Sequence, residues 1–194
     1  PISLLFGIYV QASTYKLSYP FYKENQKYAD IFSWLNRNVP KDCVILTEDY
    51  GGFLNRGILA FTHCNNYLAS PAGSLVPFDR LYYSYLVSLR LKGIKSGEIA
   101  DYLKEKKRGE EAAIYLYGDE GLSHGASSPS FAASKNKLIS DYEEFLKNGL
   151  KSELMRYKLD YIITTGGFSD EMKNLLEGFG LVYSPGDYKI YKFK

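Results

Sequence analysis

A helical pattern that states the fold class together with the strand after it lies at residues 28–38. Its apolar residues follow the i, i+3, i+4, i+7 spacing of a single helix face: Tyr28, Ile31, Phe32 and Leu35. Pro40 ends this helix, because the residue before a proline is driven out of the α region. The run that follows, 43–47, is continuously apolar and bounded by turn residues, which is typical of a strand buried on both faces. A helix followed by a buried strand predicts an α/β fold.

The rest of the chain alternates in the same way. Strands are expected at 66–69, 112–117 and 159–165, and helices from Phe78, from Ser96, over 138–146, around 154–157 and after Ser169. The alternating residues 188–193 and the turn Pro185-Gly186-Asp187 predict a C-terminal antiparallel hairpin. Strands that alternate with helices predict a mostly parallel, Rossmann-like sheet with helices on both faces, and the hairpin supplies its antiparallel edge.

The first ten residues are almost wholly apolar, and the sequence starts with Pro1 rather than Met. This run is about half of the ~20 residues that a membrane span requires. It is therefore either the end of a transmembrane helix that begins upstream or an ordinary buried helix or strand. The polar, Tyr-rich residues 11–25 include Pro20 and predict a loop. The predicted organisation is a membrane-helix tail with its linker at 1–22 and a single soluble α/β domain at 23–194.

Charge and composition restrict the class of partner. The 24 Lys and Arg residues are interspersed with 22 Asp and Glu residues, so the net charge is +2 and no basic patch predicts a nucleic-acid partner. The chain also contains 19 tyrosines, a residue type favoured at wet interfaces and at membrane surfaces, although drift in composition gives the same count. An interaction domain that assembles through Tyr-rich faces is a minor hypothesis.

Ligands of open α/β sheets bind beyond the carboxyl ends of the strands. This rule selects Glu48 and Asp49 after the first strand, Ser70 after the second, Asp119 and Glu120 after the strand expected at 112–117, and residues 164–167 after the last parallel strand. Of these, Glu48, Asp49 and Asp119, together with His124, would be the active cluster of a stand-alone hydrolase or transferase. The alternative is that acidic residues occur there because the chain is entering water. The Gly- and Ser-rich segment 118–134 is longer than a routine connection, which indicates either a functional or a disordered loop.

No sequence motif predicts a cofactor-binding site or a metal site. Neither a G-x-G-x-x-G fingerprint nor a P-loop is present, and Ser123-His124, in a segment expected to be a loop, is a weak substitute for the nucleophile elbow of a hydrolase. The two histidines, His63 and His124, are ligand-binding candidates, and a metal site would require both to converge with a carboxylate such as Asp119. Cys64 directly follows His63, and consecutive residues of a strand point to opposite faces, which argues against a Cys-His pair.

The two cysteines, Cys43 and Cys64, each lie at or just before the start of an expected strand. If these strands are parallel neighbours, the cysteines lie side by side at one end of the sheet. A disulfide there would indicate an oxidising compartment. Two small buried thiols are an equally good interpretation, because free cysteine is among the most buried residue types.

Several short segments together resemble a known family. The pattern W-L-x-x-N-x-P-K-D at 34–42 is followed by the strand CVILTE and by A-F-T-H at 60–63, and YKLDYII at 157–163 precedes LVY and YKIY in the closing hairpin. These segments are similar to the extracytoplasmic C-terminal domain of multi-pass membrane glycosyltransferases of the GT-C type. The resemblance covers 28–69 and 151–193.

The resemblance implies a non-catalytic domain on the extracytoplasmic side of the cell membrane, held there by helices upstream of Pro1. In such proteins the catalytic acidic residues lie between membrane helices, so no catalytic residue transfers to this chain. The family often has an arginine where this chain has His63. The implied role is accessory: binding of a glycan or of a lipid-linked sugar acceptor, with Tyr rings stacking on sugars and carboxylates bonding to hydroxyls.

Overall fold

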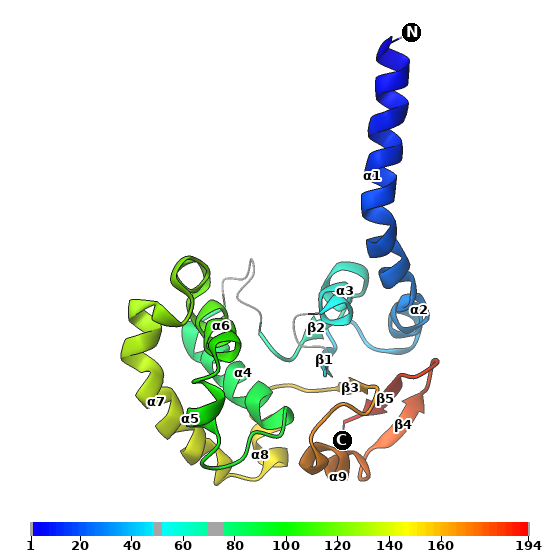
Figure 1. Ribbon diagram of the computed structural model, residues 1–194. Coiled ribbons are helices and arrows are strands. Elements are labelled where there is room, and N and C mark those ends of the chain that lie inside the picture. Colours follow the sequence, from blue (N-terminus) through cyan, green and yellow to red (C-terminus); the bar gives the residue numbers. More distant parts are fainter. Residues whose placement is uncertain (1, 49–51, 70–75, 194) are drawn as a thin grey trace.

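The computed structural model describes residues 2–48, 52–69 and 76–193 (Figure 1). The helices are α1 (Ile2–Gln26), α2 (Ala29–Asn38), α3 (Phe53–Phe61), α4 (Phe78–Leu91), α5 (Ile99–Tyr102), α6 (Lys106–His124), α7 (Pro129–Leu146), α8 (Leu150–Leu154) and α9 (Asp170–Leu176), with a 3₁₀ turn, η1 (Gly125–Ser127). The strands are β1 (Val44–Thr47), β2 (Asn65–Asn66), β3 (Tyr161–Thr164), β4 (Gly180–Tyr183) and β5 (Lys189–Lys192).

The strands form a mixed sheet in the order β2-β1-β3-β5-β4. β1 is parallel to both β2 and β3, while β5 is antiparallel to both β3 and β4. The α/β class and the C-terminal antiparallel hairpin are therefore confirmed. The sheet is not mostly parallel as expected, because two of its four strand pairings are antiparallel.

Helices cover both faces of the sheet, as expected. Successive side chains of a strand point to opposite faces. Ile45 and Ile163 pack with residues of α2 and α3 in one core, whereas Leu46 and Ile162 pack with residues of α4, α6, α7, α8 and α9 in a larger one. Figure 1 shows α2 and α3 on one side of the sheet, α9 on the other, and α4 to α8 as a helical part beside it.

The segment 112–117, expected to be a strand, lies inside α6. A short apolar run does not by itself distinguish a strand from a helix. Here Ala112, Ala113, Tyr115 and Leu116 are buried, which is the i, i+1, i+3, i+4 pattern of one helix face. Alanine and leucine also favour helix. The loss of this strand is why the parallel part of the sheet is smaller than predicted.

The Gly- and Ser-rich segment 118–134 is also helical rather than a long loop. It contains the second half of α6, the turn η1 and the start of α7. Gly118 has a φ of 51° and a ψ of −118°, a backbone conformation that needs glycine, and it kinks α6. A Cβ at Gly121 would lie 2.2 Å from the carbonyl oxygen of Ala113, so the two halves of α6 approach too closely for any larger residue. The glycines thus allow a tight reversal between helices.

Several local predictions are confirmed. α2, α4 and α7 lie where their apolar stripes were found, and the Ser169 hydroxyl accepts a hydrogen bond from the amide of Met172 at the start of α9. The helix expected from Ser96 is wrong: only a single turn, α5, forms there, and the Ser96 hydroxyl instead donates to Glu143. β2 is shorter than the expected strand 66–69 and begins one residue earlier.

Residues 11–25, expected to be a loop, belong to α1, which continues through Pro20. A proline within a helix removes one hydrogen bond and does not always end it. Among the residues that the structure describes, no helix has both the length and the hydrophobicity that crossing a membrane requires. The division of the chain at residue 22 stays a prediction, and α1 runs through that position.

Part of the tyrosine content is explained by the core. Four buried tyrosines direct their hydroxyls to backbone carbonyls: Tyr67 to Leu154, Tyr83 to Glu153, Tyr115 to Ala69 and Tyr142 to Ile94. Burial raises the pKa of all four phenols. These neutral side chains add large apolar contact area while their polar ends stay satisfied.

Candidate functional site

Glu48 lies directly after β1, at the carboxyl end of the parallel strands. Its carboxylate accepts hydrogen bonds from the amides of Thr165, at 2.7 Å, and Gly167, at 2.9 Å, and from the hydroxyls of Thr164 and Thr165. All four donors belong to the end of β3 and the turn that follows it. The predicted ligand candidate therefore joins the ends of two neighbouring strands.

The hydrogen bonds determine the ionisation of Glu48. Burial by itself raises the pKa of this carboxyl, but the bonds from Thr164, Thr165 and Gly167 act in the opposite direction and together lower it. The side chain is therefore an anion at neutral pH whose two oxygens are already bonded within the protein. This arrangement suits a structural connection better than an exposed ligand-binding carboxylate.

A small cavity adjoins Glu48. Its volume is about 50 Å³, and its walls include Thr47, Leu68, Ser88 and Phe168. A water molecule occupies about 30 Å³ in the liquid, whereas small-molecule sites usually exceed about 300 Å³. The cavity has room for one or two waters and excludes a sugar.

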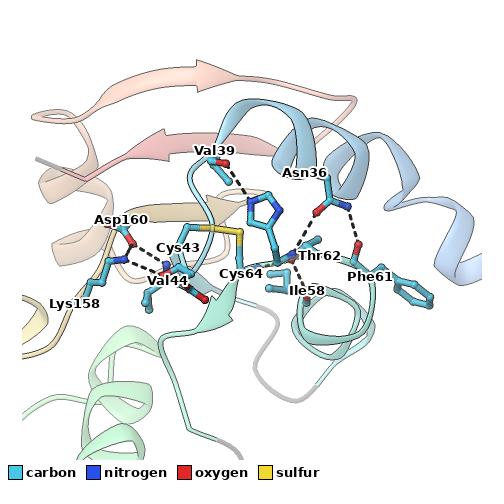
Figure 2. Close-up of a disulfide and its surroundings, with 12 residues drawn as sticks. Asn36, Val39, Cys43, Val44, Ile58, Phe61, Thr62, Cys64, Lys158 and Asp160 are labelled. Carbon is cyan, nitrogen blue, oxygen red and sulfur yellow. Dashed lines mark hydrogen bonds and ion pairs between the residues drawn. A yellow bond between two sulfur atoms is a disulfide. The ribbon is translucent and has the colours of Figure 1, made fainter.

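Cys43 and Cys64 are joined by a disulfide, with their Cα atoms 4.6 Å apart. Figure 2 shows that the bridge connects the segments that lead into β1 and β2, beside the end of α2 at Asn36 and Val39. Both cysteines are buried, with exposed fractions of 1% and 3%. The structure thus shows the bridge that the sequence left open.

His63 lies beside this disulfide. One of its ring nitrogens and the two sulfurs of Cys43 and Cys64 all lie within 4.8 Å of one another. The strand rule failed here because residues 62 and 63 lie in a bend before β2, where the alternation of side chains does not apply. The Nε2 of His63 lies 3.1 Å from the carbonyl oxygen of Val39, a contact drawn in Figure 2.

Asp119 and His124 are exposed residues of the second half of α6. Between them, Glu120 accepts bonds from Ser128 and Ser130 at the start of α7, and these bonds lower its pKa. Within this segment, Glu120 is therefore a structural carboxylate, which connects α6 to the start of α7.

The sequence candidates do not form one cluster. Glu48 follows β1, whereas His63 lies at its opposite end, because β1 pairs in parallel with β2 through Val44 and Asn65. Asp119 and His124 lie in α6, in the helical part of the molecule (Figure 1). Asp49 and Ser70 lie outside the described residues. In the described part of the chain, Cys43, His63 and Cys64 are the one group of three His, Cys, Asp or Glu residues with metal-binding spacing.

A larger cleft was not predicted from the sequence. It has a volume of about 520 Å³ and lies between the end of α4, the segment 92–96 and the start of α9. This volume falls within the range of about 300–1,000 Å³ typical of small-molecule sites. Most of the residues that line it carry a polar or charged group: Arg90, Lys92, Lys95, Ser96, Ser169, Asp170 and Glu171. Residues this far apart in sequence carry no common motif, so only their packing reveals the cleft.

Arg90 lines the cleft and is buried. Its Nε and Nη2 donate to the two carboxylate oxygens of Glu171, at 2.9 and 2.5 Å, and its Nη1 donates to the carbonyl of Asn148 at 2.7 Å. The guanidinium thus connects α4 to α9 and to the end of α7. Lys95 and Asp170 are exposed at the cleft and lie where they can meet a ligand.

Comparison with known proteins adds no family to these observations. No protein-family model, curated protein or solved structure matches the chain.

Proposed function

We propose that this chain is a non-catalytic, extracytoplasmic domain of a membrane-anchored protein similar to GT-C glycosyltransferases, and that α1 connects it to the membrane. Its parallel strands β2, β1 and β3, with helices on both faces, suit the soluble α/β domain that the alternation of strands and helices predicts. The proposal rests mainly on α1.

α1 exposes large apolar and aromatic side chains over most of its length. Phe6, Tyr9 and Leu17 are 67%, 69% and 81% exposed, and Ile8, Val10 and Tyr15 are exposed as well. The apolar residues show almost no preference for one side of the helix. Residues 2–10 of α1 are almost wholly apolar, and a helical segment that is apolar all round normally lies in a protein core or in a membrane. In Figure 1 most of α1 projects away from the rest of the molecule. Whatever buries its exposed apolar side chains therefore lies outside this chain.

A lipid bilayer fits the order of residues along α1. The apolar residues come first, up to Val10, and Tyr15, Lys16, Tyr19 and Lys23 follow. Tyrosine is enriched at the membrane–water interface, and lysine extends its amine to that interface while its stem stays apolar. At about 1.5 Å per residue, the nine residues 2–10 extend about 14 Å, roughly half of the bilayer core. We propose that helix upstream of Pro1 completes the span.

The disulfide supports the extracytoplasmic side. Disulfides persist in oxidising compartments and are rare in the cytosol. The bridge between Cys43 and Cys64 is buried, as expected for a structural rather than a catalytic disulfide.

The non-catalytic role is supported by the separation of Glu48 from Asp119 and His124, because acid–base chemistry requires the reacting groups to be within hydrogen-bond reach of one substrate. For an acceptor or glycan, the cleft beside Arg90 is a better candidate than Glu48. It offers Lys95, Ser96 and Asp170 for hydroxyls or an anionic group, and Ile94 and Leu146 for an apolar ring face.

The test is membrane fractionation of the full native gene product, with an alkaline wash and a reporter fused after Lys194. We expect the product to stay in the washed membrane with the reporter outside the cytoplasm. Release into the soluble fraction would overturn the proposal and favour a stand-alone protein. A membrane-retained product with a cytoplasmic reporter would overturn the extracytoplasmic part.

A further inference from the structure

We infer that Cys43, His63 and Cys64 form a binding site for Zn²⁺ when their disulfide is reduced. This site goes beyond the proposed function and does not depend on it. Two thiolates and one imidazole are a ligand set that zinc prefers, with water in the fourth position. The disulfide and the metal exclude each other, because the same two sulfurs would serve both.

The three ligand atoms are already gathered. They lie within 4.8 Å of one another, although Cys43 is 20 positions before His63. Tetrahedral zinc with Zn–S bonds of about 2.3 Å places its two sulfurs about 3.8 Å apart. With Cα atoms 4.6 Å apart, rotation of the cysteine side chains about their Cα–Cβ bonds can separate the sulfurs while the backbone stays in place.

The backbone around the site is held by bonds other than the disulfide. The amide of Asn65 donates to the carbonyl of Cys43 at 2.6 Å, and the amide of Asp42 donates to the carbonyl of His63 at 3.1 Å. The amide of Cys64 donates to the hydroxyl of Thr62 at 3.1 Å. None of these bonds involves a sulfur atom, so they can hold the ligands near one another when the bridge opens.

The contact of His63 with Val39 determines which of its ring nitrogens could bind a metal. Its Nε2 faces the carbonyl oxygen of Val39 at 3.1 Å, and a carbonyl oxygen only accepts hydrogen bonds. In the neutral ring Nε2 therefore carries the proton, which leaves the lone pair on Nδ1. Histidines that bind metals usually donate their other ring N–H to such an oxygen, which fixes the orientation of the ring.

The conversion requires a reductant. A dithiol transfers two electrons and two protons: the S–S bond breaks, Cys43 and Cys64 become thiols, and the dithiol closes into a cyclic disulfide. Zn²⁺ then displaces both thiol protons, which pass to the solvent, so two thiolates and a neutral imidazole hold the cation with no net charge.

The test uses Co²⁺ as a coloured substitute for Zn²⁺ on the full chain after reduction and removal of the dithiol without air. We expect thiolate-to-cobalt charge-transfer absorption that saturates at one equivalent and disappears when Zn²⁺ is added, because zinc binds more tightly than cobalt. The oxidised chain should show no such absorption. Absence of the band in the reduced chain would overturn the site.

The two histidines provide a matched pair of variants. Mutation of a residue that hydrogen-bonds to a metal ligand typically lowers the metal affinity about 10- to 100-fold. Loss of the ligand itself in His63→Ala should therefore weaken Co²⁺ binding at least about tenfold. His124→Ala, which removes the other histidine, should leave the affinity unchanged. Equal affinities for the two variants would overturn the role of His63.

A second measurement covers the case in which the reduced chain loses its fold. Zn²⁺ should raise the Tm of the reduced chain and restore its native circular dichroism, since a ligand that binds only the folded state stabilises it. The oxidised chain should show no shift. A Tm of the reduced chain that does not respond to Zn²⁺ would overturn the inference.

Discussion

The carboxylate of Glu48 accepts the amide hydrogen of Gly167 at 2.9 Å, across 119 positions of sequence. This bond, together with those from Thr164 and Thr165, joins the end of β1 to the turn after β3. The contact identifies Glu48 as a connection between two parallel strands, and it makes the stability of the fold dependent on the charge of one carboxyl.

Acid should therefore remove the contribution of Glu48. The pKa of Glu48 in the folded protein lies below its ordinary value of 4.5, so its contribution is complete above that value and is lost as the pH falls through the folded pKa. Glu48→Gln should lower the free energy of unfolding by about 1–2 kcal/mol at pH 7, a figure reduced for partial exposure. The difference from wild type should shrink below about pH 4.5 in urea unfolding. Glu177→Gln, an exposed carboxylate after α9, is the control and should change little.

The disulfide should contribute about 3 kcal/mol, the value expected for a bridge between residues separated by 21 positions. Replacing both cysteines with alanine should lower the midpoint of urea unfolding, and adding a dithiol to the wild type in metal-free buffer should produce a similar decrease. The dithiol should have no effect on the double variant. A double variant as stable as the oxidised wild type would show that the bridge is not stabilising.

α1 should bind lipid through its first turns. The chain should float with phosphatidylcholine vesicles in a density gradient, and Phe6→Asp combined with Ile8→Asp should abolish flotation, because charge is costly in the acyl region. Met155→Asp combined with Leu181→Asp places the same charges on exposed apolar residues elsewhere and should have no effect. Flotation that is equally sensitive to both pairs would argue against α1 as the contact.

The Arg90–Glu171 pair should stabilise the packing of α4 and α9. Glu171→Ala leaves the buried guanidinium without its carboxylate and should cost about 1–3 kcal/mol, less than a fully buried pair because the Glu171 side chain is 47% exposed. Glu144→Ala breaks an exposed ion pair with Lys147 and should cost no more than about 0.5 kcal/mol. If both variants lose the same free energy of unfolding in chemical denaturation, the buried pair contributes no more to stability than the exposed pair.

Gly118 should tolerate no side chain. Gly118→Ala forces a Cβ into a backbone region that favours glycine and should cost about 1–3 kcal/mol. At Gly149, φ is −66° and the space around a Cβ is open, so Gly149→Ala should cost much less. Thermal unfolding of the two variants gives the comparison. If Gly118→Ala leaves the Tm unchanged, the fold does not require the kink in α6.

The sequence by itself determined the elements whose signals are local. The apolar stripes of α2, α4 and α7, the N-cap at Ser169 and the turn of the C-terminal hairpin all depend on residues a few positions apart, and each appears where its pattern predicted it. The strand-end rule likewise found Glu48, since the position of a residue after a buried strand is a local property.

Only the tertiary structure decided the rest, because packing between distant segments leaves no local pattern. The run 112–117 is compatible with strand or helix, and its contacts with neighbouring helices select the helix. The bonds of Glu48, the Arg90–Glu171 pair and the bridge from Cys43 to Cys64 join residues 119, 81 and 21 positions apart. His63 approaches that bridge because the chain bends before β2. Strand prediction assumes that successive side chains alternate between two faces, and this rule does not hold in a bend.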